Sequence, residues 1–159
     1  MKPLRNIVLV DDSEVDLFII KQVVEQFDET IRVVDFSSPV TALEYLKISL
    51  HPNNLNHLTR PNVLILDYDM PQCNGFEFLD RLKELEFLDV KGLKIYMLTS
   101  AINLIDVNKA KANFYCLDYL SKPLTVEDLH NISIDSRPFL KEYDYQENDI
   151  NLDVYRREA

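Results

Sequence analysis

The chain has 159 residues, of which 47% are hydrophobic and 28% charged, and it carries a formal net charge of −10. This length and composition are typical of one globular domain. The acidic balance argues against a nucleic-acid-binding protein, because phosphate contacts require clustered Lys and Arg. The apolar runs are too short for a membrane span or a signal peptide, and two cysteines give no disulfide framework. We therefore expect a cytoplasmic protein that binds neither nucleic acid nor membrane.

Apolar runs and helical patterns alternate from the amino terminus onward. Residues 5–10 predict a strand, and Asp12 or Ser13 can cap the helix that follows it. Residues 31–36 predict a second strand, and Pro39 is suited to the first turn of the next helix. The chain thus begins with two strand–helix units.

The third unit contains the most apolar strand. It is preceded by residues 51–61, whose two prolines and three asparagines predict a surface loop. Residues 63–66 are four apolar residues in a row, which is typical of a strand buried on both faces. Pro71 requires the strand to end before it. Asp67 therefore lies at the carboxyl end of this strand, where open α/β sheets place their ligand crevice.

Two more units complete the pattern. Gly75 begins a helix, and residues 93–98 predict a fourth strand. Residues 102–112 look helical but have a poor apolar stripe, so we expect a weakly held helix. The remaining predicted elements are a fifth strand at 115–120, a short last helix around 126–132, and a tail at 134–159 that packs partly or not at all.

Five strand–helix units predict an α/β fold, a doubly wound parallel sheet. We expect helices on both faces, the first and fifth on one and the other three on the opposite face. In such a sheet polar residues gather at the carboxyl edge, namely Asp11, Asp12, Asp67, Thr99 and Lys122.

Each of these residues has an ordinary explanation when it is taken alone. A terminal Asp is usually a helix cap, a strand Thr reflects propensity, and a Lys before Pro is usually solvated. Together they are harder to dismiss, because three crowded carboxylates repel one another unless a cation lies among them. Hard oxygen ligands with open positions suit Mg²⁺.

At this point the sequence resembles the receiver domain (CheY-like) of two-component response regulators over roughly residues 4–133. The matching motifs follow the order and spacing of that family, and they are Val10-Asp11-Asp12, Leu66-Asp67-Tyr68-Asp69-Met70-Pro71 with Gly75, Leu98-Thr99-Ser100, and Tyr119-Leu120-Ser121-Lys122-Pro123. The resemblance implies a flavodoxin-like sheet with strand order 2-1-3-4-5. It also implies a receiver domain at 1–133 and a tail at 134–159 with no output domain.

The resemblance implies a role for each matching residue. Asp67 would be the phosphoacceptor, with Lys122 and Thr99 contacting phosphoryl oxygens. The metal site for Mg²⁺ would consist of Asp11, Asp12, Asp67 and the backbone carbonyl of Asp69. Thr99 and Tyr119 would form the conformational switch. Mg²⁺ and Lys⁺ would neutralise the charge that develops during phosphoryl transfer.

The implied function is that of a single-domain response regulator. It would take a phosphoryl group from a histidine kinase or a phosphotransfer protein and signal by binding a downstream protein target. The fourth helix, fifth strand and fifth helix would form the binding surface. We expect a monomer or weak dimer with no enzymatic activity beyond its own Mg²⁺-dependent phosphoryl transfer and autodephosphorylation. The Asp69 side chain should alter the phosphoryl lifetime.

Two alternatives fit part of this pattern. Haloacid-dehalogenase-type phosphatases also use an Asp-x-Asp pair after a strand, which Asp67 and Asp69 imitate, followed by Thr and Lys. That family would leave Asp11 and Asp12 unexplained, and it has Thr or Val where this chain has Pro71. A receiver used as a scaffold without phosphorylation is the second alternative. The presence of all five site residues argues against it.

Overall fold

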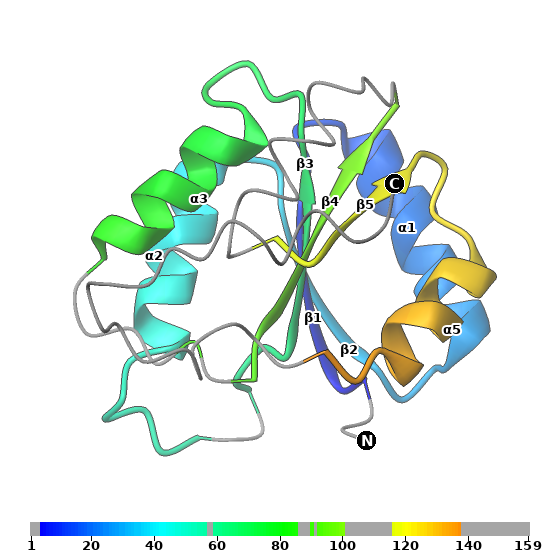
Figure 1. The fold of residues 1–159 in the computed structure, drawn as a ribbon, viewed down its shortest axis with the longest axis horizontal. Coiled ribbons are helices and arrows are strands. Elements are labelled where there is room, and N and C mark those ends of the chain that lie inside the picture. The colour runs from blue at the N-terminus through cyan, green and yellow to red at the C-terminus, as the bar shows by residue number, and fades with distance from the viewer. Residues whose placement is uncertain (1–3, 57–58, 86–89, 91, 101–115, 138–159) are drawn as a thin grey trace, which may run out of the picture.

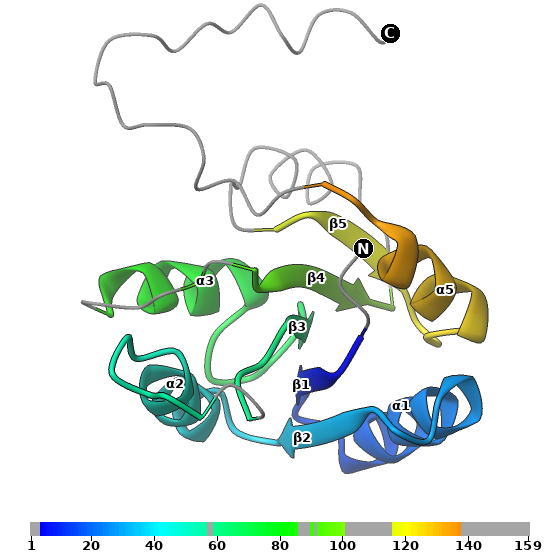
Figure 2. The ribbon, with the colours of Figure 1, turned by 90° about the horizontal axis from the view of Figure 1, so that it is seen from below.

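The computed structural model describes residues 4–56, 59–85, 90, 92–100 and 116–137. A five-stranded sheet forms the middle layer, with helices on both sides (Figures 1 and 2). The strands are β1 (Asn6–Val10), β2 (Arg32–Phe36), β3 (Val63–Asp67), β4 (Lys94–Thr99) and β5 (Asp118–Ser121). The described helices are α1 (Glu14–Phe27), α2 (Pro39–Ser49), α3 (Gly75–Glu84) and α5 (Val126–Ile134).

The sheet has the predicted topology. The strand order is β2-β1-β3-β4-β5, and every pairing is parallel. β3 lies between β1 and β4, with Ile65 opposite Leu9 on one side and Tyr96 on the other. All five residues of β3 are buried, because helices cover both faces of the sheet. The predicted doubly wound parallel fold is therefore confirmed.

The helices divide between the two faces as expected (Figure 1). α2 and α3 bury Leu46 and Phe78 in the core on one face. α1 and α5 bury Ile20 and Leu129 in the core on the other. The helix predicted at 102–112 lies outside the described residues, so its place and its weak packing stay predictions. No helix in the described part of the chain is long and apolar enough to cross a membrane.

Two boundaries differ from the sequence prediction. The fifth strand begins at Asp118 rather than near residue 115, because its ladder starts opposite Tyr96, two residues into β4. The last helix runs to Ile134, two residues beyond the predicted 126–132. The loop at 51–61 contains no helix or strand where it is described, as predicted, and it is tied to α2 by Asn54, whose side-chain amide donates to the Ser49 carbonyl at 3.1 Å.

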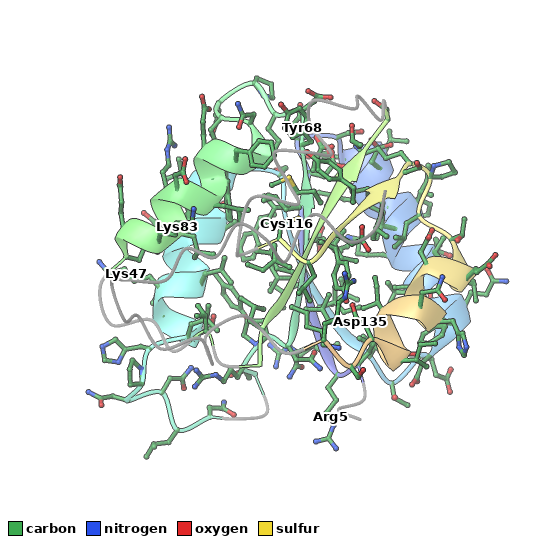
Figure 3. All side chains as sticks on the ribbon, in the orientation of Figure 1. Arg5, Lys47, Tyr68, Lys83, Cys116 and Asp135 are labelled. Atoms are coloured by element: carbon green, nitrogen blue, oxygen red, sulfur yellow. The ribbon has the colours of Figure 1, made fainter. Side chains whose placement is uncertain are left out.

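The chain that follows α5 packs against the sheet. Asp135 accepts a hydrogen bond from the Tyr96 hydroxyl at 2.8 Å and pairs with Arg137 at 2.7 Å, while the Lys94 ammonium donates to the Asp135 carbonyl. Arg137 also donates to the Leu117 carbonyl at 2.9 Å. We call Lys94, Tyr96, Asp135 and Arg137 the C-terminal clasp. Figure 3 places Asp135 beside α5, away from the edge where Tyr68 lies.

The clasp holds the Asp135 carboxylate in its charged form. Burial alone would raise the pKa of Asp135, but hydrogen bonds from Arg137 and Tyr96 outweigh burial and lower it to about 2. The first residues of the predicted tail are thus bound to β4 and, through an ion pair of Arg137 with Asp118 at 3.3 Å, to β5. The rest of the tail, from residue 138, lies outside the described residues, and the division at 133/134 stays a prediction.

Candidate functional site

Two strands, β1 and β3, bring carboxylates to the same edge of the sheet. Asp67 is the last residue of β3 and is 4% exposed, while Asp11 directly follows β1 and is 1% exposed. The Asp11 backbone amide donates to the Phe36 carbonyl at 3.1 Å, which continues the pairing of β1 with β2 beyond the strand. Asp12 is exposed. Parallel strands therefore deliver two buried carboxylates and one exposed carboxylate to a single edge, as the sequence predicts.

These three carboxylates lie close enough to share one cation. Asp11, Asp12 and Asp67 each offer an oxygen, and the three oxygens lie within 4.8 Å of one another. Carboxylate oxygens at a partly open position are the ligands that Mg²⁺ prefers, with water and a substrate oxygen filling the remaining positions. The donor set therefore fits Mg²⁺.

The loop after Asp67 is fixed by the start of α3. Asn74 caps this helix: its side-chain oxygen accepts from the Glu77 backbone amide at 2.9 Å, and the Glu77 carboxylate accepts from the Asn74 backbone amide at 3.0 Å. The Gly75 amide donates to the Tyr68 carbonyl at 2.9 Å. A Cβ at Gly75 would lie 3.1 Å from the Met97 sulfur, so glycine permits this close approach.

Lys122 brings a positive charge into the carboxylate cluster. Its backbone amide donates to the Thr99 carbonyl at 2.8 Å, which fixes the chain at the end of β5. Its ammonium lies 2.7 Å from Asp11, 2.8 Å from Asp16 and 3.0 Å from Asp67. We call Asp11, Asp12, Asp16, Asp67 and Lys122 the acidic site.

Burial and charge shift the pKa values of the acidic site. Burial raises the pKa of Asp67 to about 6; the nearby charges of Asp11 and Asp12 add to this, whereas Lys122 opposes it. Burial alone would lower the pKa of Lys122, but its hydrogen bonds with Asp11, Asp16 and Asp67 raise it above the ordinary value. Lys122 is therefore an ammonium ion, and Asp67 is a carboxylate whose charge is poorly stabilised without a further cation.

The two predicted switch residues lie next to this site. Thr99 ends β4 and is 2% exposed. Tyr119 is half-buried on β5, with its hydroxyl oxygen shielded from solvent and its ring centroid 6.3 Å from that of Tyr68. The Asp69 side chain is exposed. The roles proposed for these three residues stay predictions.

One member of the acidic site was not predicted from the sequence. Asp16 lies in the first turn of α1, where an acidic residue is common because it favours the helix amino terminus. Its amide donates to the Ser13 hydroxyl at 3.2 Å, so Ser13 is the cap of α1. A signal was available, because Asp16 is in the first turn of α1 and this turn begins at the edge of the sheet where Lys122 directly follows β5.

Comparison with known proteins agrees with this geometry. The family model of the response regulator receiver domain matches residues 7–133. The probable methanogenesis regulatory protein FilR2 of Methanothrix harundinacea is 31% identical over 123 residues, which cover 77% of this chain and 75% of FilR2. The two-component response regulator ARR17 of Arabidopsis thaliana is 26% identical over 80% of this chain and 81% of its own length.

Solved structures share the fold. A two-component response regulator from Cytophaga hutchinsonii superposes with a TM-score of 0.72 at 23% identity, covering 82% of this chain and 95% of the other. A response regulator receiver protein from Dyadobacter fermentans gives a TM-score of 0.67 at 28% identity, covering 80% and 94%. With its parallel sheet, its acidic edge and a family match across most of its length, the chain belongs to the response regulator receiver domain family.

Proposed function

We propose that this protein is a phosphorylation-dependent signalling switch of the cytoplasm, and that Asp67 accepts the phosphoryl group. One observation carries the proposal: the Asp67 carboxylate lies 3.0 Å from the Lys122 ammonium and within a carboxylate cluster that fits a divalent cation. Its expected donor is a phosphohistidine on a histidine kinase or a phosphotransfer protein. The acidic composition supports a downstream protein target rather than nucleic acid.

The transfer step is an in-line displacement at phosphorus. An Asp67 carboxylate oxygen attacks, the P–O bond forms as the P–N bond of the donor breaks, and the imidazole leaves with the electron pair and takes up a proton. Lys122 pairs with a phosphoryl oxygen throughout, which offsets the negative charge that gathers there. When bound by Asp11, Asp12, Asp67 and the Asp69 carbonyl, Mg²⁺ supplies further charge neutralisation.

The switch requires interactions that differ between the two states. Two new charge-assisted hydrogen bonds, at about 1.5–3 kcal/mol each, would approach the ~5.5 kcal/mol that carries an equilibrium from 1:99 to 99:1. Lys122 already contacts Asp67 before phosphorylation, so it contributes only the difference between its two partners. More of the switching free energy must therefore come from Thr99 and from the movement of Tyr119 that follows it. The Asp69 side chain is exposed beside the acceptor and is proposed to tune the phosphoryl lifetime.

The proposal is tested by mass spectrometry after incubation with acetyl phosphate and Mg²⁺. We expect the mass of one added phosphoryl group on the wild-type protein, and none on Asp67→Asn or, because Mg²⁺ is lost, on Asp12→Ala. Thr99→Ala should be labelled but should not bind the target. Asp80→Asn is the control, because Asp80 is exposed on α3 and pairs only with Lys83 among its described contacts. Full labelling of Asp67→Asn would overturn the assignment.

The phosphatase alternative is distinguished in the same preparation. A haloacid-dehalogenase-type enzyme would hydrolyse unrelated phosphomonoesters with many turnovers. The proposed receiver should release no phosphate from such substrates beyond the slow loss of its own phosphoryl group. Catalytic turnover of p-nitrophenyl phosphate that depends on both Asp67 and Asp69 would favour the phosphatase.

A further inference from the structure

The Lys122 ammonium has three N–H groups and three carboxylate partners. It donates to Asp11 at 2.7 Å and to Asp16 at 2.8 Å, and it forms an ion pair with Asp67 at 3.0 Å. The Asp11 and Asp67 side chains are almost fully buried at 2% and 4% exposure, whereas that of Asp16 is 36% exposed. Asp16 thus approaches Lys122 from the solvent side.

The three partners differ in what the proposed function requires of them. Asp11 and Asp67 belong to the carboxylate cluster that fits Mg²⁺, and Asp67 also accepts the phosphoryl group. Both must share their oxygens with new ligands during the reaction. Asp16 is outside that cluster, so neither the metal nor the phosphoryl group takes it from Lys122.

Both ends of the Asp16–Lys122 pair are held by the backbone. Asp16 stands in the first turn of α1, where its amide is bound by the Ser13 cap. The Lys122 amide is bound to the Thr99 carbonyl. Between these anchors the lysine has a flexible four-carbon stem that carries about 2 kcal/mol of rotamer entropy. A fixed third acceptor limits where the ammonium can move when its other two partners are engaged elsewhere.

We infer that Asp16 is a positioning residue that holds Lys122 at the phosphoryl site while the partners Asp11 and Asp67 are engaged by Mg²⁺ and phosphoryl oxygen. The inference rests on the proposed function. The competing explanation is that Asp16 makes an ordinary surface ion pair and favours the start of α1. Glu14 provides a matched control for that explanation, because it is an exposed carboxylate in the same first turn and is not among the described partners of Lys122.

The test compares Asp16→Asn with Glu14→Gln at a Mg²⁺ concentration that saturates each variant. The first measurement is the rate of Asp67 labelling by acetyl phosphate. The second is the affinity for beryllofluoride, which mimics a phosphoryl group without being transferred. We expect Asp16→Asn to reduce both about tenfold, equivalent to about 1.4 kcal/mol. Glu14→Gln should stay within about twofold of wild type, as for a surface charge.

Rescue and coupling separate positioning from a purely structural role. Asp16→Glu keeps the charge and can still reach Lys122, so it should recover most of the lost labelling rate, whereas Asp16→Ala should not. In EDTA, the effects of Asp16→Asn and Lys122→Met on the urea midpoint should be non-additive, because each removes the same contact. Glu14→Gln and Lys122→Met should be additive.

Two results would overturn the inference in different ways. If Asp16→Asn behaves like Glu14→Gln in labelling, beryllofluoride binding and coupling, the Asp16 carboxylate is a surface charge only, while the proposed function stands. If the wild-type protein itself is neither labelled nor binds beryllofluoride, the proposed function fails and the inference falls with it.

Discussion

The two ends of β4 carry charge networks of opposite balance. At its carboxyl end, the acidic site holds four carboxylates and, among the described residues, one cation, Lys122, which contacts three of them. Near the amino end of β4, the Asp135 carboxylate is bound by the Arg137 guanidinium and the Tyr96 hydroxyl. Lys94 binds the Asp135 backbone carbonyl. Accordingly, the pKa of Asp67 is raised to about 6, whereas that of Asp135 is lowered to about 2.

The difference separates a region built for binding from one built for stability. Buried carboxylates without enough positive charge raise the free energy of the folded chain, and that free energy becomes available to a cation that binds there. A carboxylate that is already paired with positive charge and hydrogen-bond donors stabilises the fold, and a cation that binds to it gains little further free energy. The clasp and the acidic site should therefore respond in opposite ways when one charge is removed.

The largest expected effect is that of removing the cation from the acidic site. Lys122→Met should lower the free energy of unfolding in EDTA by about 3 kcal/mol, because it leaves buried carboxylates without their partner. Added Mg²⁺ should restore part of this loss. Urea denaturation measures both. Lys83→Met is the control, since its pair with Asp80 is exposed and should be worth under about 1 kcal/mol. Equal losses in the two variants would contradict the comparison.

Removing a carboxylate from the same site should have the opposite sign. Asp67→Asn should raise the free energy of unfolding by about 2 kcal/mol at pH 7 in EDTA, because a neutral amide avoids the cost of a buried charge. With Mg²⁺ present the advantage should shrink, since the variant loses binding energy that the wild type gains. Calorimetry with and without Mg²⁺ tests this. A destabilised Asp67→Asn protein in EDTA would show that Lys122 already balances the site.

In the clasp, losing one partner should destabilise the protein modestly. Tyr96→Phe removes the 2.8 Å hydrogen bond to Asp135 and little else, so we expect a loss of about 1.5 kcal/mol. Labelling of Asp67 should not change. Tyr45→Phe is the matched control, because the Tyr45 hydroxyl contacts the Thr59 carbonyl only at 3.5 Å and should matter less. Stabilisation by Tyr96→Phe would mean that the clasp is strained.

The smallest expected effect is a dependence of stability on acid. Because the pKa of Asp135 is lowered from 3.8 to about 2, the unfolded chain takes up the proton more readily than the folded one. The contribution of Asp135 is therefore complete above about pH 4 and is lost as the pH falls through 2. We expect on the order of 1 kcal/mol after screening by solvent. Urea midpoints between pH 2 and 5 should fall less steeply for Asp135→Asn, and identical slopes would contradict the assignment.

Sequence patterns identified most of the fold and most of the acidic site for a common reason. A run of apolar residues followed by a polar residue predicts both the position of the strand and the side chain that reaches the carboxyl edge of the sheet. Asp11, Asp12, Asp67 and Lys122 were all found in this way. The start of the fifth strand was placed too early, because the alternation of apolar residues does not say where a neighbouring strand begins.

Asp16 and the clasp could not be found in the same way. An acidic residue in a first helical turn has a sufficient local explanation, and only the contact with Lys122, the residue after β5, gives Asp16 a second role. Tyr96 looks like one more apolar residue of a strand, and Arg137 looks like part of a polar tail. Tyr96 and Lys94 contact Asp135 from 39 and 41 residues away, and Arg137 reaches the Leu117 carbonyl 20 residues away. Local periodicity does not contain such relations.

The length of β4 has a further consequence for how the molecule can be altered. Its six residues separate Lys94 from Thr99 by five steps of roughly 3.3 Å, or about 16 Å. Substitutions farther apart than about 10 Å with no shared partner usually act independently. β4 therefore places Lys94 of the clasp beyond that distance from the carboxyl end of the strand. Stabilising changes at Lys94 should therefore simply add to the effects of substitutions at the carboxyl end of β4.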